Sequence, residues 1–471
     1  MTNRAIGRLW ALFVVLFVVL VLRAAWVMLI AGPDIASKPY NPRHALLDTR
    51  RGRILATDGT VLAQTQGNMR MYPFGEALAQ TVGYVSARYG TSGIEDAYDR
   101  ALTPADTTGD PLAQLDEIRD AFAGKNSQPH GADVVTTIVP AIERTLWSDL
   151  SRYSRAAGVV LDPSSGAVLA IASVPSYDPE HYDTEFSSLV SDPQSPLLNR
   201  ATSGLYPPGS SFKIFVASAA LEDGTVQMDS RFEDPGYLQV GNFTFHNNES
   251  EATGDQDLTG AFALSSNVDF AQVALKMGTD QFYDAMDKWG IGASLDFQLP
   301  AETDRIPPKD SVVPGELAQM GFGQDALLMT PLQMALIGAT VANGGTMPRP
   351  YIVRQIVRNG KVASVTPPGT LATPISLQTA QEVTKMMIAV VQRGTGTVAQ
   401  IHGVQVAGKT GTATNPHGAS HSWFVSFAPA DHPRFIVAII VENVGYGASY
   451  AAPIARDVLE TALATPQAGP R

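Results

Sequence analysis

The chain of 471 residues contains no cysteine. This absence excludes disulfide bonds, thiol nucleophiles and cysteine-ligated zinc or iron–sulfur sites. Two hydrolase motifs are also missing, because the sequence has neither a Gly-x-Ser-x-Gly elbow nor a His-Glu-x-x-His pair. We therefore expect a protein that uses no metal and no cofactor.

Positive charge is also scarce. Lys and Arg number 33 against 45 for Asp and Glu, which gives a formal net charge of -12, and the basic residues form no patch. This balance disfavours nucleic acid as a partner. Hydrophobic residues make up 45% of the chain, so it is a folded protein and long enough for two or three domains.

A long apolar run lies near the N-terminus, from Leu9 to Ile30, interrupted only by Arg23. As a helix it would be about 33 Å long, which suits a bilayer core. Arg4 and Arg8 precede it, so we expect a cytoplasmic tail over 1–8 and a transmembrane anchor over 9–30. The alternative is a cleaved secretory signal. Both predict that the catalytic part lies outside the cytoplasm, and with the uncleaved anchor we expect it at the cell membrane.

The rest of the chain divides by pattern into two parts and a tail. Residues 31–130 predict a small mixed α/β pedestal module, with two short strands around Asp58-Gly59. Residues 131–463 predict an α+β domain, because two apolar strands near 157–173 are followed by many helical patterns and then by strands near 403–413, 421–428 and 434–442. This order favours an antiparallel sheet packed with helices. Residues 464–471 predict a loose tail.

A serine and a lysine lie one helical turn apart at the start of a predicted helix, and this helix has no polar face. Tyr206-Pro-Pro-Gly209 cannot continue a helix, so the helix begins at about Ser210, and Ser210 and Lys213 share one face. Burial lowers the pKa of a lysine by disfavouring its charged form. A neutral amine beside a hydroxyl is a general base beside a nucleophile.

Two further patterns make this pair specific, since Ser-x-x-Lys alone is common by chance. Ser265-Ser-Asn267 lies at a break between two helical runs, and Lys409-Thr-Gly411 follows a strand-like run that includes 404–407. The order Ser-x-x-Lys, Ser-x-Asn, Lys-Thr-Gly is the signature of penicillin-binding proteins and serine β-lactamases.

On these motifs the chain resembles class B penicillin-binding proteins, the peptidoglycan D,D-transpeptidases, and is most similar to the actinobacterial PbpA type. The likeness also includes Thr330-Pro-Leu-Gln-Met334, Trp423-Phe-Val-Ser-Phe-Ala-Pro429 and a fainter pedestal match at Arg51-Gly-Arg-Ile54. It implies a five-stranded antiparallel sheet covered by helices on both faces. It also implies that β-lactams acylate the serine.

The resemblance implies a role for each motif residue. Ser210 would attack the carbonyl between two D-alanines of a stem peptide, and Lys213 would accept its proton. Ser265 would return a proton to the departing D-alanine. Asn267 would hold Lys213 and the substrate amide, and Lys409 would supply positive charge near the substrate carboxylate.

The residues after Lys409 would bind the substrate. Thr410 and Thr412 would hydrogen-bond its carboxylate, with Gly411 between them. The backbone N–H groups of Ser210 and Thr412 would form the oxyanion hole. The peptide could lie along the strand that includes 404–407 by strand addition.

Other functions remain open on the sequence alone. Gly403 to Thr410 fits the nucleotide P-loop pattern, although the residues after Lys409 do not predict the helix that a P-loop requires. A β-lactamase of the same fold could use Glu302 or Glu316 as a base. A D-Ala-D-Ala carboxypeptidase or a β-lactam-binding sensor would share the motifs. His417 and His421 are expected in a solvated loop.

The resemblance also implies partners. These are peptidoglycan stem peptides, β-lactam antibiotics and a membrane glycosyltransferase of the SEDS family that would contact residues 9–130. Whether the cell-wall synthesis serves growth or division stays open.

Overall fold

The computed structural model describes residues 2–26, 50–104, 130–247, 251–415 and 418–466. Its first element is helix α1 (Thr2–Trp26). Among the described residues, no helix meets the length and hydropathy that a membrane crossing requires. The structure therefore does not show the anchor expected over 9–30, of which 27–30 lie outside the described residues. Most of the tail at 464–471, and His417, lie outside them too.

The N-terminal module is built from short elements. They are β1 (Ile54–Leu55), β2 (Val61–Gln66), β3 (Met69–Met71), η2 (Gly75–Leu78), α4 (Ala79–Val82), β4 (Val85–Ser86), β5 (Gly90–Thr91), α5 (Gly93–Ala97), α6 (Asp99–Leu102) and β6 (Asp133–Thr136). The expected hairpin is present as β1 and β2. Its turn uses Gly59 at φ 88°, a left-handed conformation that glycine adopts without cost.

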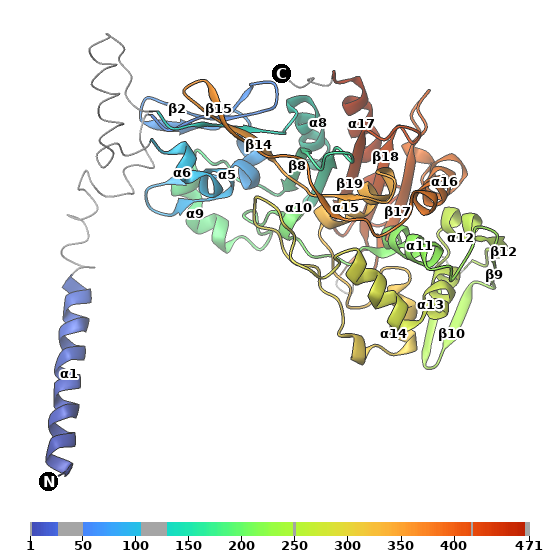
Figure 1. The fold of residues 1–471 in the computed structure, drawn as a ribbon, viewed down its shortest axis with the longest axis horizontal. Helices are drawn as coiled ribbons and strands as arrows, with labels where there is room; N and C mark the ends of the chain where they lie inside the picture. Colours follow the sequence, from blue (N-terminus) through green and yellow to red (C-terminus); the bar gives the residue numbers. More distant parts are fainter. Residues whose placement is uncertain (1, 27–49, 105–129, 248–250, 416–417, 467–471) are drawn as a thin grey trace.

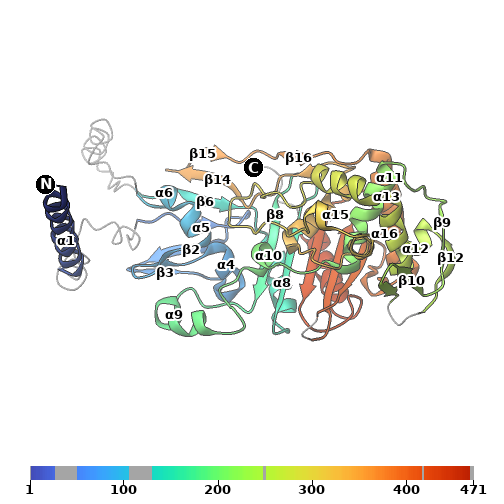
Figure 2. The same ribbon diagram turned by 90° about the horizontal axis from the view of Figure 1, so that it is seen from below.

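A hairpin from much later in the chain completes the sheet of this module. It consists of β14 (Val353–Arg358) and β15 (Lys361–Val365). The six-stranded order is β15-β14-β6-β1-β2-β3, with β14 antiparallel to β6. Figure 2 shows β14 and β15 alongside β6. The two parts predicted from the sequence thus share one hydrogen-bonded sheet.

The second sheet has five strands in the order β17-β18-β19-β7-β8, and every neighbouring pair is antiparallel. Its strands are β7 (Ala156–Leu161), β8 (Val168–Val174), β17 (Ala407–Ala413), β18 (His421–Ala428) and β19 (Phe435–Val441). The predicted five-stranded antiparallel sheet is confirmed. One boundary is wrong, because β17 begins at Ala407 rather than near 403.

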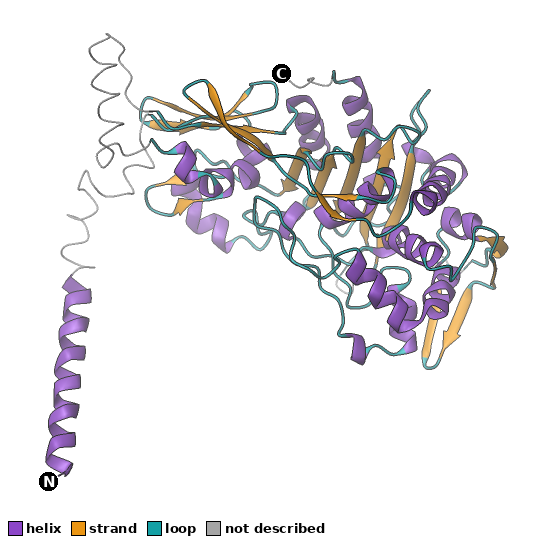
Figure 3. Ribbon diagram, viewed as in Figure 1, coloured by secondary structure: helices purple, strands orange, loops and turns teal. Residues whose placement is uncertain are grey.

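Both faces of this sheet are buried, and β19 shows how. Ile436, Ala438 and Ile440 belong to one hydrophobic core, while the alternate residues Val437 and Ile439 belong to a second. This alternation follows from the two-residue repeat of a strand. Helices α8 (Pro140–Leu150) and α17 (Ala451–Ala464) cover one face, and α15 (Pro331–Ala342) covers the other (Figure 3). Helix α16 (Leu377–Arg393) packs on β17.

The segment between β8 and β17 carries the helices and small strands around the motifs (Figure 1). Its remaining elements are α9 (Tyr182–Ser191), α10 (Arg200–Ser203), η4 (Gly209–Phe212), α11 (Lys213–Glu222), β9 (Arg231–Asp234), β10 (Tyr237–Val240), β11 (Phe243–His246), β12 (Gly254–Asp257), α12 (Leu258–Leu264), α13 (Asn267–Lys288), η6 (Lys309–Ser311), α14 (Pro314–Met320), β13 (Met347–Pro348), β16 (Thr370–Ala372) and, just before β17, η7 (Thr397–Ala399).

Candidate active site

Ser210 lies on a tight turn pressed against the edge of the five-stranded sheet. The turn is the 3₁₀ helix η4, and it opens with Gly209 at φ 53°. A Cβ on Gly209 would lie 2.6 Å from the carbonyl oxygen of Thr412, so only glycine fits this close approach. Ser210 is 6% exposed. The turn thus holds the serine hydroxyl beside β17.

Lys213 begins α11 and is fully buried. The helix starts here rather than at Ser210 as predicted, because Gly209–Phe212 form the 3₁₀ turn. The Lys213 Nζ donates to the backbone oxygen of Ser265 at 2.7 Å and to Asn267 Oδ1 at 2.9 Å. A neutral amine has two N–H donors and one lone pair. These two bonds can occupy both donors, and the longer contact with Ser265 Oγ, at 3.4 Å, leaves the lone pair available to accept a proton.

Ser265 ends α12 in a left-handed conformation, at φ 62° and ψ 35°, which is uncommon for a serine. Ser266 then caps α13, because its hydroxyl accepts a hydrogen bond from the amide of Asp269. The predicted break between two helical runs is this turn. It places the Ser265 hydroxyl, the Ser265 carbonyl and the Asn267 side chain on Lys213.

Lys409 reaches the same serine from the sheet. It lies on β17 and is 0% exposed, and its Nζ donates to Ser265 Oγ at 2.7 Å. The Lys213 Nζ lies 3.4 Å from the same Oγ. The Ser265 hydroxyl therefore sits between two amines, in position to relay a proton between them.

Both amines lose basicity in this environment. Burial, assisted by the nearby charge of Lys409, holds the pKa of Lys213 well below its usual range, against the opposing effect of Asp269 and Asp234. Burial lowers the pKa of Lys409 to about 7. Lys213 can therefore be the neutral base that the sequence predicts. Lys409 is charged only in part at neutral pH, which qualifies its expected role as a positive anchor.

The Lys-Thr-Gly strand presents an open edge, since β17 is the first strand of the sheet and pairs on one side only with β18. Thr410 Oγ1 lies 2.6 Å from Thr395 Oγ1. At Gly411 a Cβ would lie 3.0 Å from the carbonyl oxygen of Pro208, so a larger residue would push the Ser210 turn away. Because β17 begins at Ala407, strand addition along 404–407 does not fit, and the residues of β17 that line the cavity described next are Thr410 and Thr412.

A cavity of about 430 Å³ joins these groups. Ser210, Ser265, Thr410 and Thr412 line it, so the motif hydroxyls converge on one space. The amines of Lys213 and Lys409 are not in the lining and reach the cavity through Ser265. The middle residue of the Ser-x-Asn motif, Ser266, also lines it. Further lining residues that no motif indicated are Asn247, Glu251, Thr253, Leu264, Thr395, Tyr446, Gly447, Ala448 and Ser449.

The P-loop interpretation, the two candidate β-lactamase bases and the expected position of His421 do not fit this geometry. Lys409 lies inside a strand that continues to Ala413, whereas a P-loop lysine opens a helix. Glu302 and Glu316 do not line the cavity, and the Glu316 carboxylate accepts from the amide of Val313. His421 is not in a solvated loop. It is the first residue of β18, half-buried, with Nδ1 accepting from the amide of Asn443.

Comparison with known proteins gives two family matches. Residues 156–460 match the penicillin binding protein transpeptidase domain. Residues 51–134 match the penicillin binding protein A dimerisation domain.

Whole-chain relatives are also found. The peptidoglycan D,D-transpeptidase PbpA of Mycolicibacterium smegmatis is 34% identical over 98% of this chain and 99% of its own length. The transpeptidase domain of a peptidoglycan glycosyltransferase from Eggerthella lenta superposes with a TM-score of 0.79 at 34% identity, over 88% of this chain and 98% of its own. The penicillin G acyl-enzyme complex of penicillin-binding protein A from M. tuberculosis gives 0.80 at 32% identity, over 88% and 100%.

Proposed function

The chain belongs to the class B penicillin-binding protein transpeptidases, and we propose that it is a peptidoglycan D,D-transpeptidase of the PbpA type with Ser210 as its nucleophile. One observation carries the proposal: Ser210 and Ser265 line the same cavity, and two buried amines of lowered pKa flank the Ser265 hydroxyl. A mobile proton is therefore available beside the nucleophile.

Acylation follows from the donor and acceptor arrangement. The Ser210 oxygen attacks the carbonyl carbon between the two D-alanines while its proton moves to the free lone pair of Lys213. The backbone N–H groups of Ser210 and Thr412 stabilise the oxyanion. The C–N bond then breaks, and the departing D-alanine amine takes a proton through Ser265. Attack by an amine of a neighbouring stem peptide releases Ser210 and forms the cross-link.

Recognition of the donor stem uses the edge of β17. The peptide adds as a strand to β17 where Thr410 and Thr412 line the cavity, and its carboxylate meets their hydroxyls. Lys409 assists when protonated. Gly411 carries no side chain and so lets the Ser210 turn pack close to this strand. A β-lactam has the same carbonyl and carboxylate, so it acylates Ser210 and blocks the site.

Labelling with a fluorescent penicillin tests the nucleophile. We expect a stable covalent adduct on the wild-type chain and none on Ser210→Ala. Labelling of the mutant would remove Ser210 from its role, and rapid turnover of the adduct would indicate a β-lactamase. Mass spectrometry of products from two stem peptides separates a cross-linked dimer from the hydrolysed stem that a carboxypeptidase makes.

We also propose that the N-terminal segment anchors the chain in the cell membrane, with the catalytic part extracytoplasmic, where it works with a SEDS-family glycosyltransferase. The support is the continuous row of exposed apolar side chains on α1 from Leu12 to Leu22. Replacing residues 1–30 with an unrelated anchor should abolish co-purification of the glycosyltransferase while penicillin labelling persists. Normal co-purification and growth would count against this partner.

A further inference from the structure

A buried carboxylate lies beneath the Ser-x-Asn turn. Asp234 ends β9 and is 1% exposed. Its Oδ2 accepts hydrogen bonds from Ser266 Oγ at 2.7 Å, Asn247 Nδ2 at 2.6 Å and Thr253 Oγ1 at 2.5 Å, and its Oδ1 accepts from the amide of Gly236 at 2.8 Å. Four donors on one carboxylate keep it ionised, and together they lower its pKa although burial opposes them.

Asn247 connects this carboxylate to the catalytic motif. While its Nδ2 bonds Asp234, its Oδ1 accepts from the amides of Asn267 at 2.8 Å and Val268 at 3.2 Å. These are the first amides of α13, which have no partner inside their own helix. The Asn267 side chain in turn accepts from Lys213 Nζ. Hydrogen bonds thus connect Asp234 through Asn247 to the backbone of Asn267, whose side chain contacts the amine.

A second connection runs through Ser266, the middle residue of the motif. Its hydroxyl donates to Asp234 and also caps α13. Figure 1 shows β9 and β12 beside α12, so this small two-stranded sheet supports the turn from outside the main sheet. The left-handed conformation of Ser265 persists only where its surroundings hold it. Asp234 accepts hydrogen bonds from the two side chains that hold this turn, Asn247 and Ser266.

We propose that Asp234 is a positioning residue for this reaction: through Asn247 and Ser266 it fixes the Ser-x-Asn turn and thereby aims the lone pair of Lys213 at Ser210. The proposal rests on the proposed function. Asp234 is not among the residues that line the cavity, so it acts through the residues that hold the base.

Asp234 also acts on Lys213 through its charge. The charged groups that influence Lys213 are Lys409 from β17, which lowers its pKa, and Asp269 from α13 and Asp234 from β9, which raise it. Removal of the Asp234 charge should therefore lower the pKa of Lys213 further. Since acylation requires the neutral amine, the acid limb of the rate profile should move to lower pH.

The test measures the second-order rate of penicillin acylation between pH 5 and 10, on full-length protein, with the active fraction determined by titration. Asp234→Asn should lower the plateau by about 10- to 100-fold, because a misaimed base is costly. It should also move the acid limb to lower pH. Asn247→Ala removes the same hydrogen-bonded connection but keeps the carboxylate. Its plateau rate should therefore fall about tenfold, while the acid limb of its rate profile stays at the wild-type pH.

Asp255→Asn is the matched control, because Asp255 lies on the neighbouring β12 but pairs with Arg231 at the surface. It should match the wild type at every pH. A merely structural role for Asp234 would lower the active fraction without moving the limb. Wild-type plateaus in both Asp234→Asn and Asn247→Ala would overturn the proposal, and so would a wild-type plateau in Asn247→Ala alone if Asp234→Asn does not fold. Failure of the wild-type chain to acylate at Ser210 would instead refute the proposed function.

Discussion

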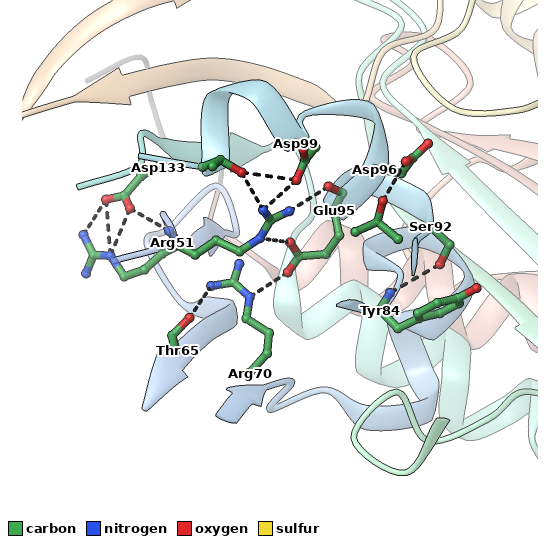
Figure 4. A network of polar contacts seen from close by, with 12 residues as sticks. Arg51, Thr65, Arg70, Tyr84, Ser92, Glu95, Asp96, Asp99 and Asp133 are labelled. Carbon is green, nitrogen blue, oxygen red and sulfur yellow. Dashed lines mark hydrogen bonds and ion pairs between the residues drawn. The ribbon is translucent and has the colours of Figure 1, made fainter. Parts of the chain in front are cut away.

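The N-terminal module and the active site both bury cations, but they give them different neighbours. In the module, Arg51 and Arg70 point at the same carboxylate, with Arg51 Nε 2.8 Å from Glu95 Oε2 and Arg70 Nε 2.7 Å from Glu95 Oε1 (Figure 4). All three residues are buried. In the active site, Lys213 and Lys409 are 0% exposed, and neither makes an ion pair with any described residue.

The groups around a buried cation determine whether its pKa rises or falls. Burial opposes the charge of Arg51, but Glu95 and Asp99 outweigh it and raise the pKa of Arg51 above its usual value. Around Lys213 the contacts are a carbonyl, an amide oxygen and a hydroxyl, so burial prevails and the pKa falls. A paired cation stabilises a fold, whereas an unpaired amine in a dry site becomes a base.

The largest effect should come from removing the unpaired amine. Lys213→Met keeps the volume but supplies no base, so penicillin acylation should fall about 10²- to 10⁴-fold. Stability should be unchanged or higher, because no buried amine has to be desolvated. Lys213→Arg should be equally inactive since it retains a proton at all relevant pH. Near-normal acylation in either variant, with an unaltered exposed-site control such as Lys309→Met, would contradict Lys213 as the base.

The next variant turns the active site into an ion pair like that of the module. Asn267→Asp places a carboxylate where Asn267 Oδ1 accepts from Lys213. The new charge should raise the pKa of Lys213 and lower acylation at pH 7 by roughly 10- to 100-fold. Raising the pH should recover part of the loss. Asn267→Ala introduces no charge, so its loss of acylation should not recover as the pH rises. Identical pH–rate profiles for the two variants would show that the charge is not the cause.

The converse change breaks the pair in the module. Glu95→Gln leaves Arg51 and Arg70 with a neutral partner in a buried site, which should cost about 3–5 kcal/mol of unfolding free energy. Denaturant unfolding measures this loss, while penicillin acylation should stay at the wild-type rate. Asp133→Asn, which disturbs the partly exposed pair with Arg53, should have a much smaller effect. A large loss of acylation in Glu95→Gln would mean that the two regions are coupled.

Much of the site could be predicted because local patterns carry it. Tyr206-Pro-Pro-Gly209 forces a turn, and the apolar residues after it favour burial. Four of the motif residues, Lys213, Ser265, Asn267 and Lys409, are in contact in the structure, and Ser210 lines the same cavity as Ser265. The alternating apolar runs likewise indicated the five-stranded sheet. Each of these signals lies within a few consecutive residues.

What the sequence missed depends on contacts between distant segments. Asp234 ends β9 and Asn247 follows β11, at positions that resemble surface turns in the sequence, and the packing of both strands against α13 accompanies their burial. The pairing of β14 with β6 is a matter of register that no local pattern specifies. The sequence predicts a start for β17 that is too early, because the first paired residue depends on the partner strand. Ala407 pairs with Phe427, and β18 ends one residue later.

The smallest effect concerns stability and pH. The pKa of Lys409 is about 7 in the folded chain and about 10.4 when unfolded. Between these values the unfolded state holds the proton and the folded state does not, so stability attributable to Lys409 is lost as pH falls from about 10.4 to 7. Lys409→Met removes this penalty, and its advantage in melting temperature over the wild type should be largest near pH 7 and shrink towards pH 10.

Arg51→Met supplies the contrast, because a paired arginine stays protonated in both the folded and the unfolded state. Its loss of melting temperature should be constant over that range. Parallel curves for Lys409→Met and the wild type would mean that the Lys409 amine remains charged in the fold.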